Sequence, residues 1–473
     1  MSDLIALVLF FLALVLLRFL RSVLFPPSSF PKDIPVVPFW VSTLGFVTKL
    51  GQDEIYMRYI RPLMEKEGVV AMWFGGRWNI VAGHPNMSKE IYNDFVKSGN
   101  NEKIPHSVLA YFLGANIIST RDEAWQRFRT VFAPGFRQHW KPSVFQECVK
   151  DMFEEIDKKC KNAEVIETNN LMQRLSMDGI GMAAFGKKFN AIKNPSTAIS
   201  VAHSIVKKSI FKPLFLFFPV LDQLPIRSRI EARRRIDWME SVLFEAAEKA
   251  VEEDNQVLTI IARLVKAYES GILTKTEFRD NLMVIFVAGH ENVQQALTSL
   301  LYLLAKHWDV QDKARAEVHA YSLEDLTTAE RMPSLPYLQR VVKETLRMYP
   351  PIPMLINRCT TRPTLLGRFI IPAQTYVGWH AFGAHHDRRV WKDPEVFDPE
   401  RFGDGVGRYE WVPFSEGERK CLGMKLALTE MQTIAAVLLH QYTWDLTGDA
   451  KVKMTPGGLL APVGLRLQFK RLE

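Results

Sequence analysis

The chain has 473 residues, of which 47% are hydrophobic, so it can bury one large core, although its length alone also permits two or three domains. Its net charge of +8 is spread along the sequence without a basic arm, which argues against nucleic acid and leaves an anionic membrane surface or an acidic protein as partners. Four scattered cysteines form no CxxC pair, which excludes a disulfide framework and a zinc site of that type and favours a reducing compartment.

The chain begins with an unbroken apolar run over residues 4–17, followed by Arg18 and Arg21. This run is short for a membrane span, which needs roughly 20 residues, unless the two arginines extend the helix by snorkelling. A cleaved signal peptide is the alternative, but the charges follow the apolar run and there is no small-x-small cleavage site. We therefore expect a single-pass transmembrane anchor over residues 1–25, with the rest of the chain in the cytosol.

A proline-rich segment follows the predicted anchor. Five prolines between Pro26 and Pro38 predict a stiff, extended hinge over residues 26–39, and the globular part is expected over residues 40–473.

The globular part contains more helical than β patterns. Apolar residues at helical spacing predict helices over 234–254 and 281–306. Short β-prone stretches bounded by Gly and Pro predict strands near residues 70–83, 364–380 and 451–470. No internal repeat or composition shift marks a second domain, so the sequence predicts one mainly α unit with a minor β-sheet region.

The most specific motif is the segment FSEGERKCLG over residues 414–423. A thiolate that ligates haem iron must keep its negative charge, so its loop needs backbone N–H donors and a nearby cation. The segment resembles the F-x-x-G-x-R-x-C-x-G loop of the cytochromes P450. The resemblance implies the cytochrome P450 fold, with haem b held between an oxygen-binding helix and this loop. It also implies Cys421 as the iron ligand, Arg419 at a haem propionate, and Phe414 and Gly423 beside the haem.

Two further motifs match the family behind the haem. Glu344 and Arg347 form an E-x-x-R pair, whose spacing puts both side chains on one helix face. By itself this pair is weak, since many exposed helices carry it. Arg401 lies in the segment DPERF, and the resemblance implies a structural network of Glu344, Arg347 and Arg401.

Three more residues match haem-contacting positions of the family. Trp125 and Arg129 resemble its W-x-x-x-R helix, which crosses the haem edge, and Arg358 matches a position that binds a propionate. The resemblance therefore implies that these three residues bind the cofactor, with packing or a surface role as the alternative.

Residues 288–293, AGHENV, resemble the oxygen-binding A-G-x-[D/E]-T signature, which implies Ala288 beside the haem and Glu291 and Asn292 as catalytic residues. Asn292 stands where the family usually has threonine. A hydroxyl donates and accepts at one atom, so it relays the proton that cleaves the O–O bond better than an amide does. Efficient proton delivery then requires water, Glu291 or the substrate. His290 is expected to pack or to bind solvent rather than to ligate iron.

The residues in these motifs are most similar to those of fungal microsomal members of the family related to the dityrosine-forming enzyme. This implies a haem-thiolate monooxygenase or oxidase of secondary metabolism that acts on a small apolar or aromatic metabolite, by oxidative phenol coupling or by hydroxylation of a tyrosine-derived compound. One alternative is a fatty-acid or lipid hydroxylase. Another is a non-catalytic haem-binding protein, against which the polar pair Glu291 and Asn292 argues.

Stretches near the substrate also follow from the resemblance. They are residues 104–118, 211–218, Phe286, Ala288, 351–356 and 459–461. For residues 211–218, two readings stay open: the pocket wall, or a segment that dips into the membrane.

The resemblance implies O2, an NADPH cytochrome reductase and a small-molecule substrate as partners, and no nucleic acid. Lys420 and Lys425 beside the ligand loop suit an acidic reductase, although two lysines are equally an ordinary solvated face. With the anchor, the expected location is the endoplasmic reticulum membrane, with the catalytic domain on the cytosolic side.

Overall fold

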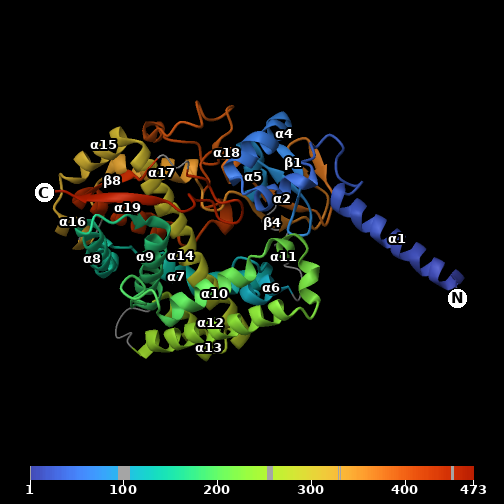
Figure 1. Ribbon diagram of the computed structural model, residues 1–473, viewed down its shortest axis with the longest axis horizontal. Coiled ribbons are helices and arrows are strands. Elements are labelled where there is room, and N and C mark those ends of the chain that lie inside the picture. Colours follow the sequence, from blue (N-terminus) through green and yellow to red (C-terminus); the bar gives the residue numbers. More distant parts are fainter. Residues whose placement is uncertain (1, 94–106, 253–258, 329, 331, 449–451) are drawn as a thin grey trace.

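The computed structural model describes residues 2–93, 107–252, 259–328, 330, 332–448 and 452–473. It shows a mainly helical body from which one helix, α1 (Ser2–Leu24), projects at the N-terminus (Figure 1). Sheet strands β1 (Val69–Phe74) and β4 (Leu355–Cys359) lie in the part of the body near α1, and the long helix α14 (Lys275–Lys306) crosses its middle (Figure 1).

The other helices of the first half of the chain are α2 (Phe39–Thr48), α3 (Gln52–Ile55), α4 (Arg61–Glu67), α5 (Pro85–Asn93), α6 (Val108–Leu113), α7 (Asp122–Phe136), α8 (Gln146–Lys161), α9 (Thr168–Ile180), α10 (Ala198–Ile210) and α11 (Pro213–Phe217). Those of the second half are α12 (Arg227–Glu252), α13 (Ile260–Glu269), α15 (Trp308–Val318), α16 (Leu323–Thr328), α17 (Pro336–Met348), α18 (Ala381–His385) and α19 (Met424–Gln441). The remaining strands are β2 (Arg77–Ala82), β3 (Ile166–Glu167), β5 (Thr364–Leu366), β6 (Phe369–Ile371), β7 (Tyr376–Trp379), β8 (Tyr442–Leu446) and β9 (Arg466–Arg471).

The largest sheet has the strand order β1-β2-β7-β4. β2 runs antiparallel to β1, with Val81 opposite Val70, and parallel to β7. β4 pairs antiparallel with β7, and its register shifts between Ile356 and Arg358. A shift of this kind turns a side chain out of the regular alternation, and Arg358 is one of the predicted haem contacts.

The long helix α14 begins at a capping box. The Glu277 backbone N–H donates to Thr274 Oγ1 at 3.2 Å, and the Glu277 carboxylate accepts from the Thr274 N–H at 2.9 Å. Most of the helix is buried on every side, as expected of a helix in the centre of a large domain. It packs along α9 on one side and against α19 and α17 on others, so it fixes the positions of these helices.

The C-terminal end of α1 docks on the body. The Phe19 ring lies 6.1 Å from the Phe218 ring, and Trp78 Nε1 donates to the Ser22 carbonyl at 3.0 Å. In the segment after α1, Ile34 and Val37 are buried, and the Val37 N–H donates to the Ala71 carbonyl at 2.8 Å. The predicted hinge therefore packs along β1 in this structure.

The structure confirms a mainly helical fold with small sheets. The predicted helices over 234–254 and 281–306 correspond to α12 and α14, and the predicted strand stretches hold β1, β2, β5, β6, β7 and most of β9. The strands β3, β4 and β8 were not predicted; β3 has only two residues and pairs with β9, which lies at the far end of the chain.

Candidate active site

A short stretch in the middle of α14 is partly accessible, whereas the helix on both sides of it is buried, and this stretch marks the centre of the site. Residues 278–286 and 293–305 of this helix are all buried. Between them, Val287, Ala288, Gly289 and Asn292 remain partly accessible. Because these residues lie in the middle of an otherwise buried helix, there is a hollow beside them inside the protein.

The ligand loop holds Cys421 in the interior as well. Its side chain is accessible, yet the surrounding protein is close enough that burial raises the pKa of the thiol. Both observations hold together only if the sulfur faces an internal hollow. Backbone N–H groups of Gly423 and Met424 lower the pKa of Cys421 in opposition to burial, as does the charge of Lys420.

The backbone of the loop explains its glycine. Gly417 has φ +76°, and a Cβ at this position would lie 2.7 Å from the Tyr92 carbonyl oxygen. Only glycine combines this conformation with so close an approach. The Cys421 N–H then donates to the Phe414 carbonyl at 3.0 Å, which closes the loop around the sulfur.

Arginines gather near the loop. The guanidinium groups of Arg129 and Arg419 lie 5.4 Å and 4.4 Å from the centre of the Trp125 ring. Burial lowers the pKa of Arg358 to about 10. Burial and the charges of Arg358 and Arg129 together lower the pKa of Arg419 to about 10. Arg419 donates to the Thr120 carbonyl at 2.8 Å, while its buried Nε has no hydrogen-bond partner within the described residues.

These features fit a haem. A cysteine loop faces one side of an internal hollow, and buried cations that repel one another need an anion such as a pair of propionates. The donor set is thus complete for a haem-thiolate site: one soft sulfur ligand, N–H groups that support its charge, and arginines for two carboxylates.

The structure also brings together Glu344, Arg347 and Arg401. Glu344 and Arg347 are fully buried and form two hydrogen bonds of 2.7 Å and 2.9 Å, and Arg401 Nε donates to Glu344 Oε1 at 3.0 Å. Arg347 also donates to the carbonyls of His385 and Pro394 at 2.6 Å and 2.9 Å. This network ties α17 to the segment that leads to the ligand loop.

The carboxylate of Glu291 is turned toward α10. It accepts from His203 Nε2 at 2.9 Å and from Lys207 Nζ at 2.8 Å. Burial raises the pKa of Glu291, but the His203 hydrogen bond and the Lys207 charge outweigh it and hold the pKa well below its usual range. Glu291 is therefore ionised at physiological pH. The sequence analysis missed His203 and Lys207, whose spacing of i and i+4 on α10 was the available signal.

Asn292 differs from its neighbour. Its Nδ2 donates to the Ala288 carbonyl one helical turn earlier at 3.2 Å, and its Oδ1 is buried without a hydrogen-bond partner within the described part of the chain. The Asn292 amide thus donates one hydrogen bond within its own helix, while its oxygen accepts none from the described residues.

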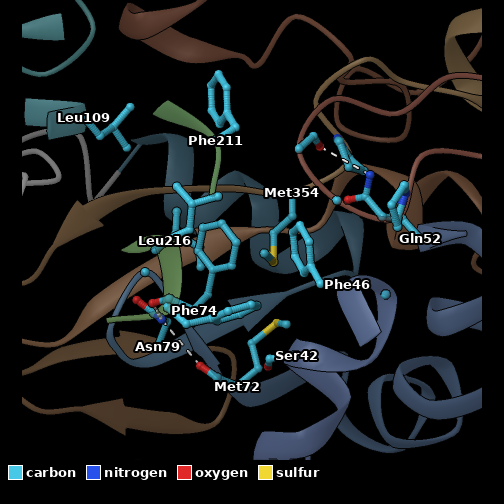
Figure 2. Close-up of a pocket in the computed structure, with 18 of the residues that line it drawn as sticks. Ser42, Phe46, Gln52, Met72, Phe74, Asn79, Leu109, Phe211, Leu216 and Met354 are labelled. Carbon is cyan, nitrogen blue, oxygen red and sulfur yellow. Dashed lines mark hydrogen bonds between the residues drawn. The ribbon is translucent and has the colours of Figure 1, made fainter. Parts of the chain in front are cut away.

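An apolar cavity of about 340 Å³ lies among β1, α2, the α10–α11 connection and the segment before β4. Figure 2 shows Phe46, Phe74, Phe211, Leu216 and Met354 along its wall. Such a volume is at the small end of ligand pockets. Neutral hydrogen-bonding groups, among them Ser42, Gln52, Asn79 and Ser107, also line it.

Most of the stretches expected near the substrate contribute to this wall. Residues of 211–217, 353–356 and Leu460 line it, and so do Ser107 and Leu109, whereas residues 104–106 lie outside the described chain. Phe286 and Ala288, also expected near the substrate, do not line it, and neither do Asn292 and Cys421. The fully buried Phe286 ring packs against Phe189 and His203 instead. His290 is also fully buried, as expected of a packed residue.

Comparisons with known proteins agree with this geometry. The Cytochrome P450 family model matches residues 35–469. The chain is 36% identical to Cytochrome P450-DIT2 of Saccharomyces cerevisiae, with 95% of both chains covered. It is 32% identical to Cytochrome P450 monooxygenase xanG of Aspergillus fumigatus, with 95% of this chain and 89% of that one covered.

Among solved structures, the haem domain of cytochrome P450DA has the same fold, with a TM-score of 0.76, 19% identity, and 93% of this chain and 98% of that chain covered. The family match and the two fungal relatives set aside the alternative of a non-catalytic haem protein. The chain belongs to the cytochrome P450 family and is a monooxygenase that binds haem b through a cysteine thiolate.

Proposed function

We propose that this enzyme oxidises a small aromatic metabolite in fungal secondary metabolism, with a tyrosine-derived phenol as the preferred class and oxidative coupling as the preferred reaction. The observation that carries the proposal is the cavity, since a wall of aromatic rings with amides and hydroxyls, and with charges limited to Arg77 and the Asp222–Arg229 ion pair, suits a small ring that bears hydroxyl groups. A fatty-acid or lipid hydroxylase is the second candidate, favoured by the same apolar wall.

Each residue of the site has a proposed role. When bound, haem b activates O2 with electrons from a reductase, and a thiolate ligand favours O–O cleavage. Cys421 supplies this thiolate, and the N–H groups around it stabilise its charge. Arg129, Arg358 and Arg419 bind the propionates, with Trp125 beneath two of them. The Glu344 network is structural, because it holds the approach to the loop.

Glu291 and Asn292 have different proposed tasks. The carboxylate of Glu291 is held ionised by its partners, so it neither donates nor takes up a proton at neutral pH; it accepts hydrogen bonds and orients the groups or water along the proton path. Asn292 Oδ1 lacks a donor, and a phenolic hydroxyl is a suitable one. A substrate held in this way supplies its own proton, which compensates for the missing threonine.

We further propose three parts for the chain: an anchor over 1–25, a hinge over 26–39 and the catalytic domain over 40–473. Helix α1 is 23 residues long, and its outer part carries no contacts to the body (Figure 1). Its inner end packs on Trp78 and Phe218, which favours a retained anchor over a cleaved signal. Residues 211–218 serve both roles that were left open, since Phe217 lines the cavity while Leu214 is exposed.

The proposed location is the endoplasmic reticulum membrane with the catalytic domain in the cytosol, where an NADPH cytochrome reductase is available. Lys425 is exposed beside the ligand loop. Lys420 pairs with Glu416 at 2.9 Å, so its charge is partly neutralised within the protein. Lys425 is therefore the stronger candidate for contact with an acidic reductase.

The test is turnover of the purified enzyme with the reductase and NADPH, offered tyrosine-derived phenols and fatty acids in parallel. Coupling joins two substrates without added oxygen, whereas hydroxylation adds one oxygen atom, so product mass separates them. We expect Met354→Trp to fill the cavity and abolish phenol binding, and Ile370→Trp, at an exposed position outside the cavity, to leave it unchanged. Turnover of fatty acids alone would contradict the proposal.

Two substitutions test the residues. Cys421→Ala should remove the red-shifted Soret band of the reduced carbon monoxide complex. Asn292→Thr should divert product from coupling toward oxygen insertion, whereas a better-coupled, single-product threonine variant would count against phenol coupling.

A further inference from the structure

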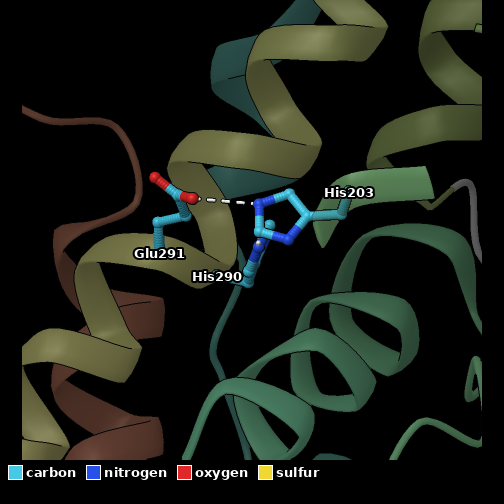
Figure 3. Close-up of side chains that lie close together, drawn as sticks. All are labelled: His203, His290 and Glu291. Carbon is cyan, nitrogen blue, oxygen red and sulfur yellow. Dashed lines mark hydrogen bonds and ion pairs between the residues drawn. The ribbon is translucent and has the colours of Figure 1, made fainter. Parts of the chain in front are cut away.

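A compact group of polar side chains lies between α10 and α14, with no role in holding haem. His203 from α10 and His290 and Glu291 from α14 are all buried, and their potential ligand atoms lie within 4.8 Å of one another. Figure 3 shows the two imidazole rings and the carboxylate converging on one point between the helices. A buried carboxylate needs a cation to compensate its charge, and buried imidazoles need hydrogen-bond partners or a metal ion. The question is therefore which cation this group binds.

The outer nitrogen of His290 is held in the way that a metal ligand requires, and that of His203 can be after one amide turns over. His290 Nδ1 bonds to the Phe286 carbonyl at 2.7 Å, so it carries the proton and leaves Nε2 as a bare acceptor. His203 Nδ1 lies 3.2 Å from the Gln173 amide, which either donates to it or, with its two ends exchanged, accepts from it. In the second arrangement His203 Nε2 is also bare. Metal-binding histidines commonly have their other nitrogen fixed by such an acceptor.

The inner atoms have separations suited to one ion. The two Nε2 atoms lie 3.3 Å apart, and His203 Nε2 lies 2.9 Å from Glu291 Oε1. Tetrahedral zinc, with bonds of about 2.0–2.1 Å, places its ligand atoms roughly 3.3–3.4 Å apart. The separation of the two Nε2 atoms matches this value, the distance from His203 to Glu291 is shorter, and all three ligand atoms lie within 4.8 Å, so a rotation of the Glu291 side chain would complete the site.

A cation already occupies one corner of the group. Lys207 Nζ binds the same Glu291 oxygen at 2.8 Å, and the Lys207 side chain is about one-third exposed, so it can move into solvent. With Lys207 as the cation, the single proton on His203 Nε2 is shared between two acceptors, Glu291 Oε1 at 2.9 Å and His290 Nε2 at 3.3 Å from that nitrogen.

We propose that His203, His290 and Glu291 form a binding site for a divalent transition metal of the zinc type, which replaces the ammonium of Lys207. Two imidazoles and one carboxylate are a donor set that suits zinc and disfavours magnesium and calcium, which prefer oxygen ligands. The metal joins α10, which leads into the cavity wall, to α14 beside the haem. The proposal is independent of which substrate the enzyme oxidises.

The experiment is equilibrium dialysis of the haem-loaded full-length protein against zinc, with the metal counted per chain. Wild type should bind one zinc ion that His203→Gln and His290→Gln each weaken by at least about tenfold, as the loss of a ligand requires. The matched control is His319→Gln, because His319 and His440 form a second histidine pair in the described chain, with ring centres 5.2 Å apart at a more exposed position. This control should leave the buried site unchanged.

A second variant changes affinity in the opposite direction. Lys207→Met removes the competing cation and should tighten zinc binding by about tenfold, because like charges a few ångström apart repel strongly at a buried site. Zinc should also raise the temperature of thermal unfolding of wild type more than that of His203→Gln. The carbon monoxide spectrum of each variant verifies that the haem site is intact. Equal zinc binding by wild type and both histidine variants, no binding by wild type, or weaker binding by Lys207→Met would overturn the proposal.

Discussion

Replacing Glu344 by leucine should destabilise the protein far more than replacing Arg401, although both belong to one network. Glu344 is fully buried and accepts four hydrogen bonds: two from Arg347, one from Arg401 Nε and one from the Asp398 N–H at 2.9 Å. Its removal leaves the guanidinium of Arg347, also fully buried, without a counter-charge.

The magnitude follows from this isolation. Removing one partner of a buried ion pair typically costs about 3–5 kcal/mol, because the other charge is left desolvated. Arg347 keeps its bonds to the His385 and Pro394 carbonyls, which places the cost of Glu344→Leu at about 3 kcal/mol, the lower end of this range. Arg401 is partly exposed, so Arg401→Met should cost only about 1 kcal/mol. The double variant Glu344→Leu, Arg347→Met should recover part of the loss, since no unpaired charge remains.

The assay is urea unfolding at constant haem saturation, followed by both far-ultraviolet circular dichroism and the Soret band. Comparing the two signals shows whether haem loss and unfolding coincide, as a single free energy requires. The reasoning would be refuted if the two substitutions were additive, that is, if the double variant were less stable than Glu344→Leu by the whole free energy that Arg347→Met alone costs. Equal costs for Glu344→Leu and Arg401→Met would refute it as well.

Three further predictions concern other positions. Burial raises the pKa of Glu430 well above its usual range, so the native state keeps a proton that the unfolded state releases. The free energy of unfolding therefore falls by about 1.4 kcal/mol per pH unit as pH rises from the Glu430 pKa of the unfolded state to that of the native state. In urea unfolding, Glu430→Gln should therefore stabilise the protein increasingly as pH rises, and Glu248→Gln, at an exposed position, is the matched control. Gly417→Ala should lower the haem content measured by Soret absorbance, through a clash with the Tyr92 carbonyl that the control Gly405→Ala lacks, since both glycines have positive φ but no atom lies near Gly405. Deletion of residues 1–25 should leave haem binding intact and release most but not all protein from membranes in a flotation assay, because Leu214 remains exposed; loss of haem would show that anchor and fold are not separable.

Much of the site was predictable because its chemistry is local. The loop around Cys421 needs a glycine with positive φ, a nearby arginine and N–H groups within a few residues, so ten consecutive letters specify it. Glu344 and Arg347 are likewise adjacent on one helix face. The N-terminal helix was also predictable from composition, since its unbroken apolar run is long enough, with the residues after it, for a helix that could cross a membrane.

The sequence by itself determined the cysteine loop, the E-x-x-R pair, the departure at Asn292 and the mainly helical class, because each depends on side-chain types at short spacing. Only the tertiary structure decided which way Glu291 points, since its partner His203 lies 88 positions away on another helix. It also decided that the arginines 358 and 419 share one electrostatic environment and that residues 211–217 close the cavity. These outcomes depend on how helices pack around α14, and packing joins residues that no local pattern relates.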